Sequence, residues 1–309
     1  MMKRTIFSIV LVFLVTLPTI LFLSCPITTG GRREERVTKT EWAVNKPGKV
    51  VVELSDLDAF IEYNIAEDFS NVYSVVCKSY IYTGEEKRYT VNYRIMSSVS
   101  PGETLGSCIV GEAEYDPIKG IVFPIEEESM KYELKIPKGL EAINNVNIVI
   151  EYNVSNLFTK VKIPATVRRP PTGSTSSLET IISYTSSPIV PKSDKIKIDV
   201  TSRSIIFYLE LIDAERCFEG YRRPPSLRIG NEIIVSAVVA GRKIDDVSCT
   251  PTTINTLPAT LRCSVDLTKN DEIYRLFASE TGIYIEIDIV LKYMCSMRNT
   301  YNIQIIRQT

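Results

Sequence analysis

Hydrophobic and polar residues alternate along most of this chain. Between Arg88 and Ile95, Tyr89, Val91 and Tyr93 are separated by threonine, asparagine and arginine. Successive side chains of a β-strand point to opposite faces of the sheet. This spacing therefore predicts a strand with one face on a core and the other in water.

The same alternation recurs through the rest of the chain. Its apolar positions are Tyr132, Leu134 and Ile136; Val146, Ile148, Ile150 and Tyr152; and Ile283, Ile285, Ile287, Ile289, Leu291 and Tyr293. Isoleucine, valine, tyrosine and threonine are residues that fit a pleated, half-buried surface. After the first 24 residues, the sequence contains no convincing helical pattern of ten or more residues. The sequence predicts an all-β, antiparallel fold.

A break in this pattern divides the chain. The stretch RRPPTGSTSS, from Arg168 to Ser177, combines adjacent prolines with hydroxyl residues, which neither build a core nor pair as a strand. We interpret it as an interdomain linker. The expected organisation is a signal peptide or membrane anchor (1–24), a tether (25–46), a first β-sandwich (47–167), the linker (168–178) and a second β-sandwich (179–309).

The two predicted sandwiches resemble each other in sequence. Residues from Asn147 onward match residues from Asp288 onward at a spacing of 141, and Cys77 falls one residue from the position matching Cys217. The matched pairs are Ile148 and Ile289, Tyr152 and Tyr293, Ser155 and Ser296, and Cys108 and Cys249. We expect two tandem homologous domains, immunoglobulin-like in outline. The one tryptophan, Trp42, is not between paired cysteines, so the immunoglobulin family itself is not inferred.

The N-terminus predicts export. Lys3 and Arg4 precede an uncharged run from Thr5 to Ser24, which is the outline of a secretory signal. As a helix rising about 1.5 Å per residue, this run would also cross a hydrocarbon layer of about 30 Å. The run is not amphipathic, which argues against a buried helix of a cytosolic fold.

The end of this run resembles the bacterial lipoprotein signal, in which cleavage precedes a cysteine that then carries lipid. Ser24 fits the small residue before Cys25, whereas Phe22 and Leu23 depart from the usual pattern. Three outcomes stay open: lipid attachment at Cys25, a retained anchor, or cleavage to a secreted product. Each places the remaining chain on the extracellular side of the membrane.

The cysteines support an oxidising compartment. Apart from Cys25 there are six, which are Cys77, Cys108, Cys217, Cys249, Cys263 and Cys295. Their number is even, none forms a Cys-x-x-Cys pair, and the chain has no histidine, so disulfides are favoured over a zinc site or buried cytosolic thiols.

The repeat suggests how these cysteines pair. It predicts Cys77–Cys108 and the matching pair Cys217–Cys249, which leaves Cys263 with Cys295. The chief rival is Cys249–Cys263, which would close the loop CTPTTINTLPATLRC.

The absence of histidine also limits catalysis. It excludes Ser-His-Asp and Cys-His mechanisms, and no phosphate-binding glycine motif is present. The acidic clusters at Glu126–Glu128, Asp56/Asp58 and Asp245/Asp246 are interpreted as solvated turns, rather than as glycosidase or calcium sites. We expect no cofactor and no metal. The net charge of -1 gives no reason to expect a nucleic-acid partner.

Two further features are candidate surface sites. Most of the sixteen tyrosines fall on the predicted core face, and Tyr80, Tyr82 and Tyr221 are expected to be the exposed ones. Asn153 begins an Asn-Val-Ser sequon, a candidate glycosylation site that lies inside a predicted strand.

These patterns favour a non-enzymatic cell-envelope protein. It would be held by its N-terminus and would present two disulfide-braced sandwiches for binding or assembly at the cell surface. One alternative is a subunit of a filament or surface layer, which passes the segment from Glu35 to Lys49 to a neighbouring sheet edge. For that segment, an ordinary first strand of its own domain is favoured. A remote alternative is an extracellular hydrolase.

Overall fold

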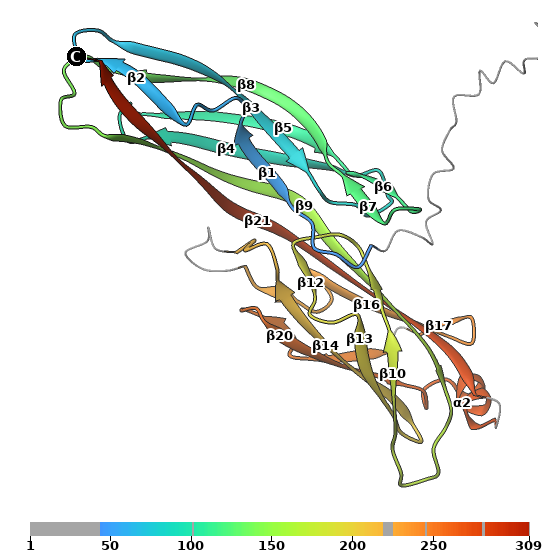
Figure 1. Cartoon of the computed structure of the whole chain (residues 1–309). Helices are drawn as coiled ribbons and strands as arrows, with labels where there is room; N and C mark the ends of the chain where they lie inside the picture. The colour runs from blue at the N-terminus through green and yellow to red at the C-terminus, as the bar shows by residue number, and fades with distance from the viewer. Residues whose placement is uncertain (1–43, 101, 219–224, 245, 280–281, 309) are drawn as a thin grey trace, which may run out of the picture. The chain divides into compact units, whose positions relative to one another are not determined.

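A computed structural model describes residues 44–308 apart from 101, 219–224, 245 and 280–281 (Figure 1). The described residues all belong to one compact unit. The predicted leader, Cys25 and most of the tether lie outside the described residues. Within the described part, no helix combines the length and apolar character needed to cross a membrane.

The first sheet has three antiparallel strands. It contains β1 (Val50–Leu54), β3 (Phe69–Ser79) and β8 (Ile125–Ile136), in the order β1-β3-β8. Tyr132 and Leu134 are buried on β8, as their alternation predicted.

The second sheet is the largest and takes strands from both halves of the chain. Its order is β17-β16-β21-β9-β4-β5, with β11 also paired to β9 and β2 paired to β21. The strands are β2 (Phe60–Asn64), β4 (Arg88–Ser97), β5 (Glu103–Gly111), β9 (Asn145–Val167), β11 (Ser183–Tyr184), β16 (Ile233–Val239), β17 (Arg242–Ile244) and β21 (Ile283–Gln308). The alternating residues predicted for β4, β9 and β21 are buried, which confirms their faces.

Strands β9 and β21 pair antiparallel over almost their whole length. The register runs from Ile283 opposite Val167 to Gln304 opposite Asn145. Between the pairs Tyr293–Leu157 and Cys295–Val154, β9 advances by one residue more than β21. This β-bulge is accompanied by a positive φ of 66° at Asn156, a conformation that asparagine tolerates.

The third sheet belongs to the second half of the chain. Its order is β10-β13-β14-β20-β18, with β12 also paired to β14. The strands are β10 (Ser176–Ile181), β12 (Ile189–Pro191), β13 (Lys195–Val200), β14 (Ser204–Asp213), β18 (Val247–Thr250) and β20 (Ala259–Asp266). Two small two-stranded sheets complete the described strands: β6 (Glu114–Asp116) with β7 (Ile121–Phe123), which form a hairpin, and β15 (Leu227–Arg228) with β19 (Thr253–Ile254).

The described residues contain one α-helix, α2 (Asp271–Ala278). The Asn270 side chain accepts a hydrogen bond from the Ile273 amide and caps its first turn. Asp271 and Glu272 place negative charge at the same end, where the helix dipole favours it. Ile273 and Phe277 are buried.

The two halves share a strand order. The order β1-β3-β8 in the first half corresponds to β13-β14-β20 in the second, and β5-β4-β9 corresponds to β17-β16-β21. The sequence match of Asn147 onward with Asp288 onward therefore aligns β9 with β21, which hold equivalent positions. Common descent of the halves stays a prediction.

All three large sheets contribute to one hydrophobic core. Its buried side chains run from Val50 on β1 through Ile163 on β9 to Phe207 on β14 and Ile287 on β21. The long strands β9 and β21 run from one half of the chain into the other, as Figure 1 shows, and both contribute buried residues to this core.

The predicted linker is only partly outside the sheets. Ser176 and Ser177 lie in β10 and pair with Val200 and Asp199, so the prediction that this stretch cannot form a strand is wrong at its end. These two serines form the start of β10, ahead of the apolar Leu178. Pro170 is buried.

The first described residues also join the halves. The Val44 and Asn45 amides donate to the Tyr184 carbonyl at 2.9 and 3.0 Å, and the Gly48 amide donates to the Ser187 carbonyl at 3.1 Å. Residues 44–48, which precede β1, therefore lie against residues 184–187, which follow β10.

Shortening Ile287 tests the shared core. Ile287 is fully buried on β21, opposite Ile163 on β9 and Ala237 on β16. We expect Ile287→Ala to lower the free energy of unfolding by about 2–5 kcal/mol, because it removes apolar contacts and leaves a cavity. Ile306→Ala on the same strand, where the side chain is 44% exposed, is the matched control. Urea unfolding measures both, and equal losses would contradict the assigned core.

Candidate functional site

Six cysteines form three disulfides in the structure. Cys77 on β3 bonds to Cys108 on β5, which links the first sheet to the large sheet. Cys217, just after β14, bonds to Cys295 on β21. Cys249 on β18 bonds to Cys263 on β20. The bonds therefore brace both halves, and two of them connect elements that are not neighbouring strands.

The pairing predicted from the repeat is correct for the first half and wrong for the second. Cys249 and Cys263 lie directly opposite each other on paired strands, with their Cα atoms 4.1 Å apart. The Cys217 carbonyl accepts a hydrogen bond from the Ser296 amide at 2.9 Å, which places Cys217 beside Cys295. The predicted pairs Cys217–Cys249 and Cys263–Cys295 do not form. The strand equivalent to β5 is β17, whereas Cys249 lies on β18, in a different sheet.

The candidate glycosylation site is accessible. Asn153 is exposed on β9, and its cross-strand neighbours are Asn92 on β4 and Ser296 on β21. Ser155, the third residue of the sequon, is half-buried on the same strand. The Asn153 side chain is accessible, but its backbone is held in an extended conformation in the middle of a sheet. Glycosylation of Asn153 stays a prediction.

The acidic clusters are not grouped into a catalytic pair. Glu126–Glu128 lie exposed on β8 rather than in a turn, so that part of the interpretation is wrong. Lys78 contacts Glu126 at 2.9 Å and Glu53 at 2.6 Å across the sheet. Asp56, by contrast, lies in the turn after β1, as expected. The described residues contain no cluster of three or more acidic or cysteine side chains able to hold a metal.

The tyrosines are mainly core residues. Those buried include Tyr63, Tyr89, Tyr152 and Tyr293. Tyr82 was expected at the surface, but it is 8% exposed because its ring packs 5.1 Å from that of Tyr115. Tyr80 is half-buried, and Tyr221 lies outside the described residues. Among the described residues, the tyrosines therefore serve packing rather than a broad aromatic face of the kind that stacks against sugars.

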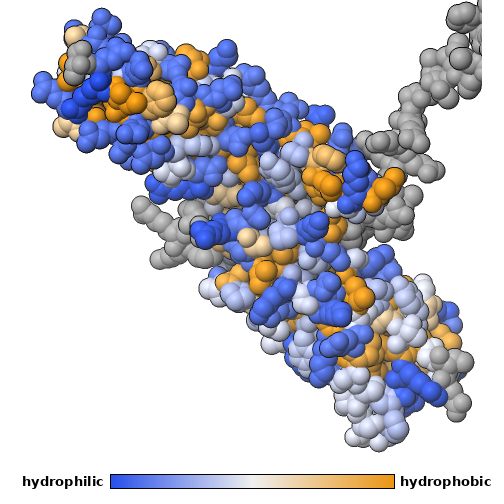
Figure 2. All heavy atoms as spheres, viewed as in Figure 1, coloured by the Kyte–Doolittle hydropathy of each residue, from blue (hydrophilic) through white to orange (hydrophobic). Residues whose placement is uncertain are grey.

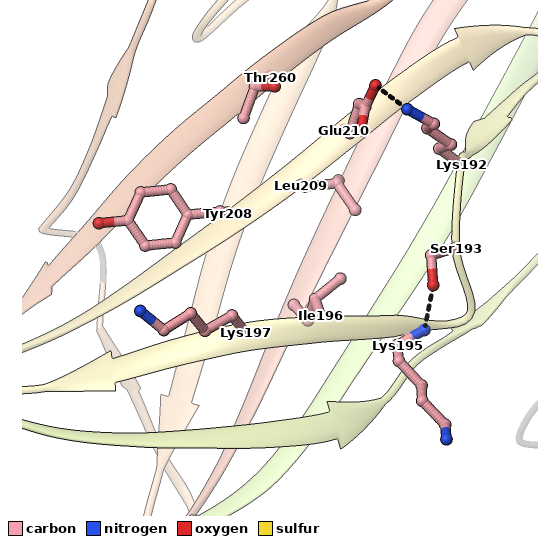
Figure 3. Close-up of a pocket in the computed structure, with 9 residues that line it drawn as sticks. All are labelled: Lys192, Ser193, Lys195, Ile196, Lys197, Tyr208, Leu209, Glu210 and Thr260. Atoms are coloured by element: carbon pink, nitrogen blue, oxygen red, sulfur yellow. Dashed lines mark hydrogen bonds and ion pairs between the residues drawn. The ribbon is translucent and has the colours of Figure 1, made fainter.

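A shallow hollow of about 410 Å³ opens beside β13 and β14 (Figure 3). Three lysines line it together with Tyr208 and Glu210. Lys192 contacts Glu210 at 2.8 Å, and Figure 3 shows Lys195 extending away from both Tyr208 and Glu210. The hollow contains one carboxylate, so it lacks the two flanking carboxyl groups of most glycosidases.

The lysines of this hollow are largely neutralised. Lys197 contacts Asp199 at 3.0 Å. A hydrogen bond from Ser177 at 2.6 Å, supported by Lys197, holds the pKa of Asp199 below its ordinary value. Asp199 therefore stays ionised beside Lys197. The hollow offers little net positive charge to an anion.

A second hollow, of about 640 Å³, has an apolar floor and a charged rim. Leu157, Phe158 and Val290 line it, together with Lys87 and Lys160. The Lys87 ammonium lies 3.7 Å from the centre of the Phe158 ring, and burial lowers the pKa of Lys87.

The rim lysines of this second hollow are also engaged. Glu85 contacts Lys87 at 3.3 Å and forms an ion pair with Lys160. These contacts hold the turn between β3 and β4 in place, so we interpret this arrangement as structural.

Glu112 is a structural carboxylate that the sequence did not reveal. It accepts hydrogen bonds from the Thr83 amide at 3.1 Å, the Gly84 amide at 3.0 Å and the Tyr89 hydroxyl at 3.2 Å. The Thr83 hydroxyl is a further donor. With its oxygens occupied in this way, Glu112 holds a turn and is not placed to act as a base.

Comparison with known proteins adds no assignment. No model of a known protein family matches this chain, and no curated protein is similar enough to it to serve as a relative. The functional argument therefore depends on the residues and their geometry.

Removing disulfides one at a time tests the pairing. We expect Cys217→Ala with Cys295→Ala to cost more stability than Cys249→Ala with Cys263→Ala, because the first bond spans 78 residues and the second 14. Loop-closure entropy gives about 4–5 kcal/mol for the longer loop and about 3 kcal/mol for the shorter one. Non-reducing peptide mapping and urea unfolding measure pairing and cost. A Cys217–Cys249 peptide would refute the assignment.

Asp288 predicts a pH dependence. Burial raises the pKa of this carboxyl, and the nearby Lys162 opposes the shift. The folded protein therefore keeps this proton to a higher pH than the unfolded chain, and it loses stability as the pH rises through a window that begins at about pH 4.

Asp288→Asn removes that loss. We expect the variant to gain stability over the wild type between about pH 3 and about pH 7, because only the wild-type carboxyl ionises in this range. The midpoints of urea unfolding of both proteins, taken at about pH 3 and at about pH 7, measure the change in stability. A stability difference that stays constant with pH would show that Asp288 does not titrate as described.

Proposed function

We propose that this protein is a non-enzymatic, exported cell-envelope protein. Its N-terminal segment is inserted in a membrane, or Cys25 carries a lipid, and the rest of the chain faces outward. There it presents two homologous, disulfide-braced β-sandwiches of immunoglobulin-like outline for binding or assembly. The observation that carries the proposal is the set of three disulfides, which support an oxidising compartment.

The N-terminal sequence supplies the anchorage. The uncharged run from Thr5 to Ser24 follows Lys3 and Arg4, and Cys25 stands where a lipidated cysteine would be expected. An oxidised body behind such a leader is consistent with export across a bilayer.

The geometry supports a binding role better than catalysis. Glu210 in the lysine hollow contacts Lys192, and Glu112 binds backbone and hydroxyl donors, so neither carboxylate is available as a general acid or base. Each of the two hollows is lined by a single carboxylate, so neither holds two carboxylates that face each other.

Filament assembly by strand addition is less well supported. The described end of the candidate donor segment, Val44 to Gly48, already pairs with Tyr184 and Ser187 of its own chain. The edge of β1 is also covered: Asn299 donates to the Val52 carbonyl at 2.8 Å and Tyr152 donates to the Val50 carbonyl at 3.3 Å. A covered edge does not accept an incoming strand.

Mass spectrometry of the protein from its native membrane tests the proposal. We expect no free thiol among the six body cysteines, and an N-terminus that is either lipidated at Cys25 or still joined to its leader. Cys25→Ser distinguishes these cases, because it releases the protein from lipid processing but leaves a retained anchor unchanged. Six free thiols in a protein that fractionates with soluble cell contents would overturn export.

A further inference from the structure

The hairpin of β6 and β7 carries an exposed apolar end. Ile118, in the turn, is 95% exposed, the highest value among the large apolar residues that the structure describes as exposed. Ile121 and Phe123 on β7 are 45% and 44% exposed. We refer to these three residues as the hairpin tip. Figure 2 shows hydrophobic residues at the surface where Figure 1 places β6 and β7.

The turn holds this tip in a defined conformation. The Asp116 carboxylate accepts hydrogen bonds from the Ile118 amide at 2.9 Å and the Lys119 amide at 3.1 Å. The Gly120 amide donates to the Asp116 carbonyl at 2.7 Å, and Gly120 has a φ of +64°, which favours glycine. The exposure of Ile118 is therefore built into a hydrogen-bonded turn.

The base of the hairpin is fixed to the body. The Ala113 amide donates to the Ile81 carbonyl at 2.8 Å. The Tyr115 ring packs against Tyr82, which is itself buried. The fixed base and the hydrogen-bonded turn hold the backbone that presents Ile118, so little backbone entropy is lost when Ile118 binds.

The size of the tip favours a bilayer over a protein partner. A stable protein interface buries about 800 Å² and some 20–30 residues on each side, whereas the tip offers three side chains. A bilayer needs no matching shape. Aliphatic Ile118 at the end and Tyr115 at the base also follow the order of a membrane surface, where aromatic rings gather at the headgroup level.

The position of the tip places it beside the N-terminal tether. The Lys46 ammonium donates to the Gly120 carbonyl at 3.4 Å, so the chain enters the described structure next to the turn. Lys46 and Lys119 balance the two acidic groups of the hairpin, Asp116, which lies 3.7 Å from Lys119, and the exposed Glu114, so the local charge does not keep the tip from anionic headgroups.

We propose that the hairpin tip inserts into the surface of the membrane that holds the N-terminus. This inference depends on the proposed anchorage, because three side chains bind weakly unless the bilayer is kept close. Linking two membrane contacts through one short segment of chain gives the second an effective concentration of about millimolar, so a weak second contact is sufficient. The tip would set how the first sheet is oriented on the membrane.

Tryptophan placed in the tip tests the insertion directly. The full chain, with Trp42→Phe to remove its one tryptophan, is reconstituted into anionic vesicles whose acyl chains carry bromine, a contact quencher. We expect Ile118→Trp to lose most of its fluorescence in brominated vesicles relative to unbrominated ones.

Leu105→Trp in the same background is the matched control. Leu105 is 66% exposed on β5, six residues before the strand end nearest the hairpin, which is about 20 Å along a strand. It should keep its fluorescence. Unchanged disulfides in both variants confirm that they are folded.

The outcomes separate the two proposals. If the chain floats with the vesicles but Ile118→Trp is not quenched, anchorage stands and hairpin insertion is wrong. If both tryptophans are quenched equally, the contact is not specific to the hairpin and the inference is again overturned. If the chain does not float with vesicles, the proposed anchorage fails and the insertion fails with it.

Discussion

The antiparallel pairing of β9 with β21 is the contact on which the rest of the structure depends. Each strand begins in its own half and continues into the other: Leu157 to Val167 pair with the start of β21, and Asn145 to Val154 pair with its end. Strand β16 from the second half and β4 from the first extend the same sheet on either side. Neither half therefore has a complete large sheet without the other, and the core runs through both.

Side-chain contacts and disulfides reinforce this shared sheet. Charged side chains pair across strands, the β1 edge is covered by Asn299 and Tyr152, and disulfides fix elements that sheet pairing does not join. Acidic groups such as Glu112 serve the turns. Loops and hairpins lie at the surface of this body, and the binding role that we propose would use them.

The sequence predicted local features well and long-range pairing poorly. Buried faces such as Tyr89 to Ile95 depend only on the two-residue period of a strand, which is visible in one segment. The partner of Cys217 depends on which strand lies beside it, and the repeat misled because Cys249 sits on β18, in a different sheet. Helix α2 was missed because it is short, although Asn270 followed by Asp271 and Glu272 is a capping signal. Ile118 gave no signal, since exposure in a turn requires the surrounding fold.

Hydrogen exchange of the intact, oxidised chain, read by mass spectrometry, tests the β9–β21 pairing most directly. Peptides from residues 145–154 and 283–293 belong to different halves of the sequence, yet they are held in one sheet. They should lose protection together, in one opening event, because separating either from its partner disrupts the shared core. If one peptide exchanges fully while the other stays protected, the halves open independently, and the pairing does not unite them as described.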